Sequence, residues 1–257
     1  MTIDQRIPRR AALLMLAGAV AACGAPHETG PAPEAITWDE GYGPLEDGQY
    51  VLPAIDRQYT AGVNRRQLVN YSEPDPAKSI VVDRHAKFLY YINEDGTAWR
   101  YPIGVGREGL AFNGVGVIQM KRDWPGWTPT QNMIRREPEV YAKYAGGVPG
   151  GLRSPLGARA LYIYRNGRDS YFRIHGTNDL PSVGFNSSAG CIRLFNQDMI
   201  HLYDMVSVPT RMRVRTYAES VRIEGEEMAH RGDQMAPTVM DIDTGATLEA
   251  SASTPRI

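Results

Sequence analysis

Residues 160–179 read ALYIYRNGRDSYFRIHGTND, and this stretch decides the fold class. Two short runs, 160–165 and 170–175, are rich in the β-branched and aromatic residues that strands prefer. They are joined through Asn166-Gly167, a dipeptide typical of tight hairpin turns because both residues tolerate positive φ. The stretch therefore predicts an antiparallel hairpin.

Runs of the same kind extend the hairpin into a larger β structure. Further strands are expected at SIVVD, KFLYYI, TAWRYPI, GVGVIQM, CIRLF and MRVRTY, which begin at residues 79, 87, 97, 114, 191 and 212. Many short strands separated by turns are typical of a mainly β domain. We expect one such domain over 78–217, which is long enough for one packed core.

One helix is expected after the CIRLF run. Asn196 can serve as its N-cap, Asp198 suits the positive end of its dipole, and apolar residues recur at helical spacing up to Val206. The segment 131–144 predicts a shorter helix that Pro138 interrupts.

Four flanking segments differ from this domain in composition. Residues 1–22 are predicted to be a signal peptide, 23–40 a flexible Pro- and Gly-rich tether, 41–77 an ordered strap, and 218–257 a disordered polar tail.

The N-terminus predicts export. A basic region ending at Arg9-Arg10 precedes an apolar run over 11–22, which is shorter than the ~20 residues that span a bilayer. The sequence before Cys23 resembles a bacterial lipoprotein cleavage box, so Cys23 is the predicted lipid attachment site. The alternative is an ordinary signal peptide that leaves Cys23 without a role. We expect a periplasmic protein held on a membrane only through this lipid.

Cys191 has no partner in the chain if Cys23 carries a lipid, since the sequence holds two cysteines. Exported proteins usually pair their cysteines, so a lone thiol is either a small buried side chain or a functional group. His175 ends an alternating strand and precedes Cys191 by a Gly- and Ser-rich loop. Such a loop can bring imidazole and thiol together, and the imidazole can then act as the base that forms a thiolate. The N–H group of Gly190 is a candidate oxyanion donor.

Other chemistries fit the sequence poorly. Zinc sites need three or four ligands at characteristic spacings, and no such pattern surrounds Cys191, so a metal site is not expected. The formal net charge is −1 and the basic residues are scattered, which argues against nucleic-acid binding.

The segments RIHGTND and SSAGCIRLFNQD together resemble the signature of the L,D-transpeptidase catalytic domain (the YkuD family). The match includes His175, Gly176, Thr177, Ser188, Gly190, Cys191, Arg193, Asn196 and Asp198. This resemblance implies a YkuD-like β-sandwich over 78–217 and an acyltransferase that acts in cell-wall biogenesis on peptidoglycan stem peptides. It also implies that neither a cofactor nor a metal is required.

The resemblance also implies roles for individual residues. Cys191 would attack the bond between the diamino acid and D-alanine of a tetrapeptide stem, with His175 as general base and acid. The main-chain carbonyl of Gly176 would orient the imidazole. The resulting thioester would pass to an amine of a second stem, giving a 3→3 crosslink, or to an amine of a protein. Support of the loop or substrate is implied for Arg193, Thr177, Ser188 and Asn196.

Ala189 departs from the family pattern, in which a histidine commonly stands just before the Gly-Cys pair. This departure leaves open the alternative of an inactive lipoprotein that binds the cell wall. A second alternative is a hydrolase that acts on the same bond, because some members of the family use water in place of an amine.

Overall fold

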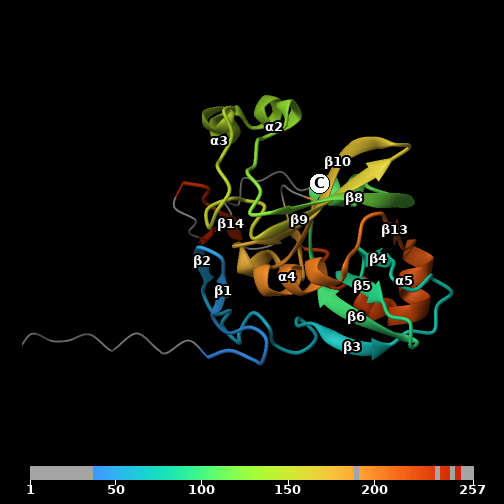
Figure 1. Ribbon diagram of the computed structural model, residues 1–257. Helices are drawn as coiled ribbons and strands as arrows, with labels where there is room; N and C mark the ends of the chain where they lie inside the picture. Colours follow the sequence, from blue (N-terminus) through green and yellow to red (C-terminus); the bar gives the residue numbers. More distant parts are fainter. Residues whose placement is uncertain (1–36, 188–190, 235–237, 244–246, 250–257) are drawn as a thin grey trace, which may run out of the picture. The chain divides into compact units, whose positions relative to one another are not determined.

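The computed structural model describes residues 37–187, 191–234, 238–243 and 247–249. Within them, the main sheet has eleven strands in the spatial order β11-β7-β12-β10-β9-β8-β13-β4-β5-β6-β3 (Figure 1). In chain order they are β3 (Gln67–Asn70), β4 (Ile80–Asp83), β5 (Phe88–Ile92), β6 (Thr97–Pro102), β7 (Gly104–Gly106), β8 (Val115–Asp123), β9 (Arg159–Arg165), β10 (Arg168–Thr177), β11 (Asn186–Ser187), β12 (Ile192–Phe195) and β13 (Thr210–Val214). The predicted mainly β fold is thus confirmed.

The predicted hairpin is β9 and β10, which pair antiparallel. Asn166 and Gly167 have φ of 52° and 73°, as the turn requires. The strand β10 continues two residues beyond His175, because Gly176 and Thr177 pair in parallel with β12. The sequence had placed the end of regular pairing at His175.

The main core lies between the two halves of this sheet. Strands β4–β6 and strands β8–β10 bury side chains in one cluster, which also takes in Met199 and Leu202 of helix α4 (Asn196–Met205). Figure 1 shows α4 between β9 and β6. The predicted helix over 196–206 is therefore present. Its buried apolar side packs in the same cluster as Ile192 and Leu194 of β12, the strand that precedes it.

The other helices are short. They are α1 (Arg107–Ala111), α2 (Gln131–Arg136), α3 (Pro138–Tyr141), α5 (Tyr217–Glu224) and α6 (Glu226–Ala229), with 3₁₀ turns at Ala142–Tyr144 and Leu180–Ser182. The interruption between α2 and α3 falls at Pro138, as expected from the sequence. No helix in the described part of the chain is long and apolar enough to cross a membrane.

Strands β4 and β5 are buried on both faces, and helix α6 helps to cover the face that points away from the main core. The prediction of a disordered tail over 218–257 is therefore wrong at its start. Residues such as Val81 and Tyr90 face away from the main core and pack in a second cluster, against which Met228 of α6 lies. Helix α5 begins at a capping box formed by Thr216 and Glu219. The segment 217–229 is therefore ordered rather than disordered. Beyond it, β14 (Thr238–Met240) pairs with β15 (Thr247–Glu249).

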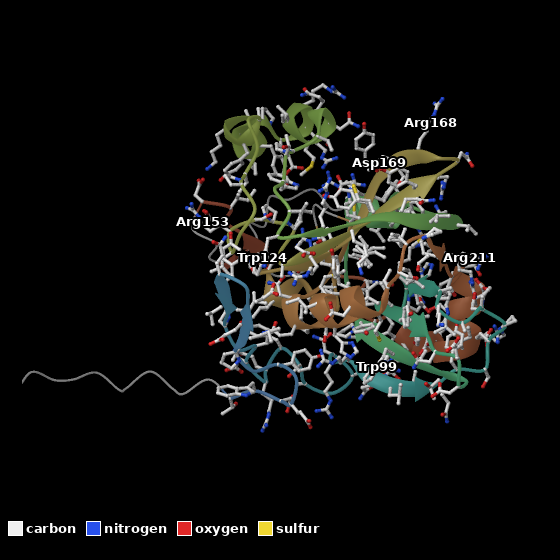
Figure 2. All side chains as sticks on the ribbon, in the orientation of Figure 1. Trp99, Trp124, Arg153, Arg168, Asp169 and Arg211 are labelled. Carbon is white, nitrogen blue, oxygen red and sulfur yellow. The ribbon has the colours of Figure 1, made fainter. Side chains whose placement is uncertain are left out.

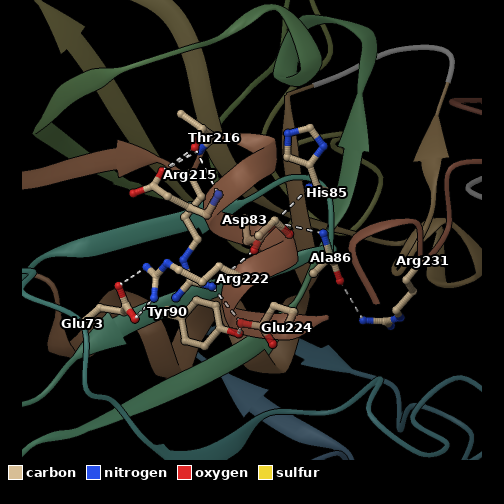
Figure 3. A network of polar contacts seen from close by, with 12 residues as sticks. Glu73, Asp83, His85, Ala86, Tyr90, Arg215, Thr216, Arg222, Glu224 and Arg231 are labelled. Carbon is tan, nitrogen blue, oxygen red and sulfur yellow. Dashed lines mark hydrogen bonds and ion pairs between the residues drawn. The ribbon is translucent and has the colours of Figure 1, made fainter. Parts of the chain in front are cut away.

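A buried polar network ties α5 to this face of the sheet (Figure 3). Arg215 is 1% exposed, and its Nη1 lies 3.3 Å from Asp83 Oδ2 and 2.8 Å from Glu224 Oε1. Ser220 donates to Asp83, and the Tyr90 hydroxyl donates to Glu224. Because a buried charge without partners is costly, these contacts depend on one another.

The segment before residue 78 is integrated with the domain. Its β1 (Leu45–Asp47) and β2 (Tyr50–Leu52) form a hairpin, while β3 joins the main sheet at the edge beside β6. Tyr42 packs against Phe195, and its hydroxyl donates to Asp198 at 3.0 Å. The strap expected over 41–77 therefore supplies one strand of the sheet and contacts the helix that follows β12.

Candidate active site

The parallel pair β10 and β12 places the two predicted reactive residues on one face of the sheet. Ile174 faces Ile192 in the register, and both side chains are buried in the core. Because side chains alternate along a strand, His175 and Arg193 project to the opposite face. Cys191, two positions before Arg193, shares that face. The two candidates are thus diagonal neighbours on adjacent strands.

Both residues line a cavity of about 270 Å³. Of the residues singled out from the sequence, the cavity is lined by His175, Thr177, Cys191 and Arg193. Ser188 and Gly190, as well as Ala189, lie outside the described residues, and so do Cys23 and the predicted signal peptide.

His175 is held in one orientation. Its Nδ1–H donates to the main-chain carbonyl of Gly176 at 2.8 Å, which fixes the tautomer and leaves Nε2 as an acceptor. The side chain is 4% exposed. Burial, assisted by the Arg193 guanidinium, lowers the pKa of His175 to about 4. The ring is therefore a neutral base at pH 7.

Cys191 is also buried, at 8% exposure. Burial raises the pKa of its thiol to about 11, and the Glu108 carboxylate acts in the same direction. Its Sγ lies 3.8 Å from the carbonyl oxygen of Tyr171, to which the thiol donates. In the free site the pair is therefore a neutral thiol and a neutral imidazole. This differs from the thiolate expected from sequence, because burial outweighs the nearby guanidinium groups.

The turn from β7 into α1 holds the backbone of Cys191. The Gly106 N–H donates to the Cys191 carbonyl at 2.8 Å. A Cβ on Gly109 would lie 2.3 Å from the same carbonyl oxygen, so the close approach requires glycine. Residues of the neighbouring strand β7 and of helix α1 thus fix the position of the Cys191 backbone.

The carbonyl that accepts from the Cys191 thiol belongs to Tyr171, which lies in a bulge of β10. The register of β9 and β10 shifts between Asp169 and Arg173, and Tyr171 within it has φ of 63°. Asp169 accepts from the Tyr171 N–H at 2.8 Å and forms two hydrogen bonds with Arg173, at 2.7 and 2.8 Å. Figure 2 labels Asp169 on this hairpin. A left-handed tyrosine beside the Cys191 thiol is a strained feature of the kind found at functional sites.

Arg193 is anchored to the loop after β10. Its Nη1 lies 3.1 Å from Asp179 Oδ2 and 3.4 Å from Ser182 Oγ. Asp179 is 1% exposed, and its N–H donates to the Thr177 hydroxyl at 3.0 Å. Arg193 and Thr177 therefore both contact the loop that leads toward Cys191.

Asn196 does not cap its helix, which corrects the expectation from sequence. The N-cap is Phe195, and no side chain caps the helix. Asn196 Oδ1 instead accepts from the Ala158 N–H at 2.9 Å, and its Nδ2 donates to the Thr177 carbonyl at 3.2 Å. Tertiary contacts explain the difference, because the amide is drawn inward to satisfy buried backbone groups beside His175.

The sequence did not identify several other residues that line the cavity. Trp127, Met133 and Tyr141 come from the segment that contains α2 and α3, and Glu108 comes from α1. Thr130 accepts from the Met133 N–H and caps α2, so the Thr-Pro-Thr sequence before α2 carried a readable signal for this part of the lining. No comparable signal marks Glu108, because α1 has only five residues.

A family model and curated relatives point to the same family. A family model described as the L,D-transpeptidase catalytic domain (YkuD) matches residues 77–215. The probable L,D-transpeptidase ErfK/SrfK of Escherichia coli K12 is 38% identical over 140 residues, which cover 53% of this chain and 44% of that protein. A putative L,D-transpeptidase of Fuscovulum blasticum is 32% identical over 168 residues, which cover 65% of this chain and 84% of that protein.

One solved structure that is similar bears a different name. It is the crystal structure of a probable carnitine operon oxidoreductase from Brucella melitensis, 40% identical, covering 60% of this chain and 95% of that one, with a TM-score of 0.43. At that TM-score the match adds nothing to the assignment. The chain spans about half the length of the E. coli relatives that it matches.

Proposed function

Because the chain belongs to the YkuD family of L,D-transpeptidase catalytic domains, we propose that it is a peptidoglycan L,D-transpeptidase with Cys191 as its nucleophile. The observation that carries this proposal is the placement of His175 and Cys191 on one face of adjacent strands, in one cavity. The imidazole is oriented by the Gly176 carbonyl, so its free nitrogen is available to the thiol.

In the first half of the proposed reaction, Cys191 takes the acyl group of a tetrapeptide stem. His175 Nε2 accepts the thiol proton as sulfur attacks the carbonyl carbon between the diamino acid and D-alanine. The N–H groups of Gly190 and Cys191 are the proposed oxyanion donors. The C–N bond then breaks, the imidazolium gives its proton to the leaving amine, and D-alanine departs from a thioester.

In the second half, an amine attacks the thioester. The amine nitrogen forms the new amide bond, its proton passes to His175, and the C–S bond breaks. The sulfur then recovers the proton as a thiol, and the product is a 3→3 crosslink or an attachment between a protein and a stem. Water in place of the amine would give hydrolysis of the same bond.

The protonation states of Cys191 and His175 in the empty site affect the first step of the proposed reaction. Because the thiol pKa is raised and the imidazole pKa is lowered, charge separation in the empty cavity is unfavourable. We therefore propose that proton transfer accompanies attack on bound substrate, when the charge develops on the substrate oxygen rather than on sulfur alone.

Residues 78–217 are the proposed catalytic domain, and the N-terminal segment is the proposed export and anchoring device. Signal cleavage before Cys23 with lipid attachment there would hold the enzyme on a membrane, outside the cytoplasm. The tether over 23–40 would separate the domain from that membrane. Such a location agrees with a substrate that lies in the cell wall.

The test is product analysis with purified tetrapeptide fragments. Dimers indicate the transpeptidase, tripeptides alone indicate a hydrolase, and fragments that bind unchanged indicate an inactive module. Cys191→Ala and His175→Ala should each abolish D-alanine release. An acyl adduct of a carbapenem on wild type, detected by mass spectrometry and absent from Cys191→Ala, would identify the nucleophile directly.

A further inference from the structure

Glu108 is fixed beside the nucleophile by the backbone on either side of it. The preceding Gly106 donates to the Cys191 carbonyl, and the following Gly109 packs against that carbonyl too closely for any side chain. Glu108 lies between these two contacts and lines the same cavity as Cys191 and His175. Its position relative to the thiol is therefore set by the main chain.

The carboxylate of Glu108 is only half satisfied. Its Oε1 lies 3.3 Å from Arg136 Nη2, and Arg136 in turn contacts Glu137. Its Oε2 is buried and has no hydrogen-bond partner in the described part of the protein. A buried carboxylate oxygen without a donor carries a free-energy cost, which a donor supplied by a ligand would remove.

The other acid that lines the cavity differs in this respect. Asp179 is held by Arg193, so its charge is already matched by a guanidinium. In the described lining of the cavity, Glu108 is the carboxylate with an oxygen left for a ligand.

The residues around Glu108 suit a ligand that carries an ammonium group on an alkyl chain. Arg136, its partner, lies on α2, and Met133 of the same helix and Tyr141 of α3 line the cavity. These side chains form an apolar wall for methylene groups, and aromatic faces attract cations. An ammonium has three donors and no acceptor, so it is complementary to a carboxylate in such a wall.

We propose that Glu108 binds the cationic amine of the acyl acceptor and holds it beside the thioester. This rests on the proposed function, and it assigns one residue of this chain to the binding of the acceptor amine. One N–H of the ammonium donates to Glu108 Oε2. The ammonium first gives one proton to solvent, and the resulting amine keeps an N–H on Glu108 Oε2. As its nitrogen attacks the carbonyl carbon, a second proton passes to His175. The C–S bond then breaks, and His175 returns that proton to the sulfur.

The test separates acceptor binding from acylation. The donor is a tetrapeptide stem, and the cationic acceptor is a tripeptide stem, which lacks D-alanine and can only accept. Hydroxylamine serves as a second acceptor because it is uncharged at neutral pH. Glu108→Gln keeps the shape and the acceptor for Arg136 but removes the charge. Glu137→Gln is the matched control, since Glu137 shares Arg136 but does not line the cavity.

We expect Glu108→Gln to raise the KM for the tripeptide by about tenfold, the effect of losing one hydrogen bond between charged groups at a partly exposed site. D-Alanine release with hydroxylamine should stay unchanged, and Glu137→Gln should leave both reactions unchanged. An unchanged KM for the tripeptide overturns the proposal, and so does an equal loss with both acceptors, which indicates structural damage. Wild-type enzyme that releases no D-alanine with either acceptor overturns the proposed function itself.

Discussion

Replacement of Asn196 by alanine tests the bridge that supports the candidate base. The amide accepts from the Ala158 N–H and donates to the Thr177 carbonyl, and both residues are buried, at 0% and 2% exposure. Asn196→Ala removes the side-chain partner of both buried backbone groups. Each such group costs about 1–3 kcal/mol, so we expect a loss of about 3 kcal/mol in the free energy of unfolding.

The assay is thermal unfolding, compared across three variants. A loss of 3 kcal/mol corresponds to a fall in Tm of about 6–12 °C for a domain of this size. Asn113→Ala is the matched control, because Asn113 is exposed and makes one long hydrogen bond, at 3.4 Å, to the Ala111 carbonyl. We expect that control to stay within about 0.5 kcal/mol of wild type.

Asn196→Asp distinguishes the bridge from a helix cap. Aspartate is as good a cap as asparagine and also suits the helix dipole, so a capping role predicts no loss. In the bridge, aspartate would place an oxygen against the Thr177 carbonyl, and the loss should approach that of alanine. A stable aspartate variant, or a loss near 1 kcal/mol for alanine, would refute the bridge and restore the cap. Because the bridge adjoins Gly176, acylation by a carbapenem should slow along with the loss of stability.

Three further predictions follow from the site. Alkylation of Cys191 by iodoacetamide should rise with pH toward about 11, and a plateau near neutral pH would show a thiolate pair instead. Gly109→Ala should cost about 1–3 kcal/mol by thermal unfolding and slow acylation, because its Cβ would lie 2.3 Å from the Cys191 carbonyl oxygen, whereas Gly146→Ala, in open space, should do neither. The pKa of His175 is about 4 when folded and about 6.5 when unfolded, so the unfolded state binds the proton first and stability falls as pH drops from 6.5 to 4. This contribution is at most about 3 kcal/mol, and Tm measured against pH should fall less in His175→Asn than in wild type.

The strands could be predicted from the sequence because the patterns that indicate them are local. Alternation and an Asn-Gly turn identify β9 and β10 without knowledge of any other segment. The helix after β12 was also readable from its periodicity. His175 lies near the end of one predicted strand and Cys191 at the start of another, so the sequence predicted that their side chains meet. The role of the Gly176 carbonyl was implied by the family motif alone.

The remaining features depend on contacts between distant residues. Asn196 fits a cap pattern, yet buried groups at Ala158 and Thr177 compete for its amide more strongly. Helix α5 has a capping box, but its polar composition is typical of a tail. It is ordered because Glu224 and Ser220 bond to the buried Arg215 and Asp83, which lie elsewhere in the chain. The raised pKa of Cys191 arises from burial, which no short stretch of sequence reveals.

The parallel register of β10 and β12 links catalytic competence to correct folding. Ile192 and Leu194 are buried in the core, while Cys191 and Arg193 project to the other face. A slip of one residue would exchange the two sets, sending the thiol into the hydrocarbon interior and two aliphatic side chains into the cavity. A misregistered molecule would therefore be chemically silent as well as unstable. Acylation of this one sulfur atom by a carbapenem can then report how much of a preparation has the correct register.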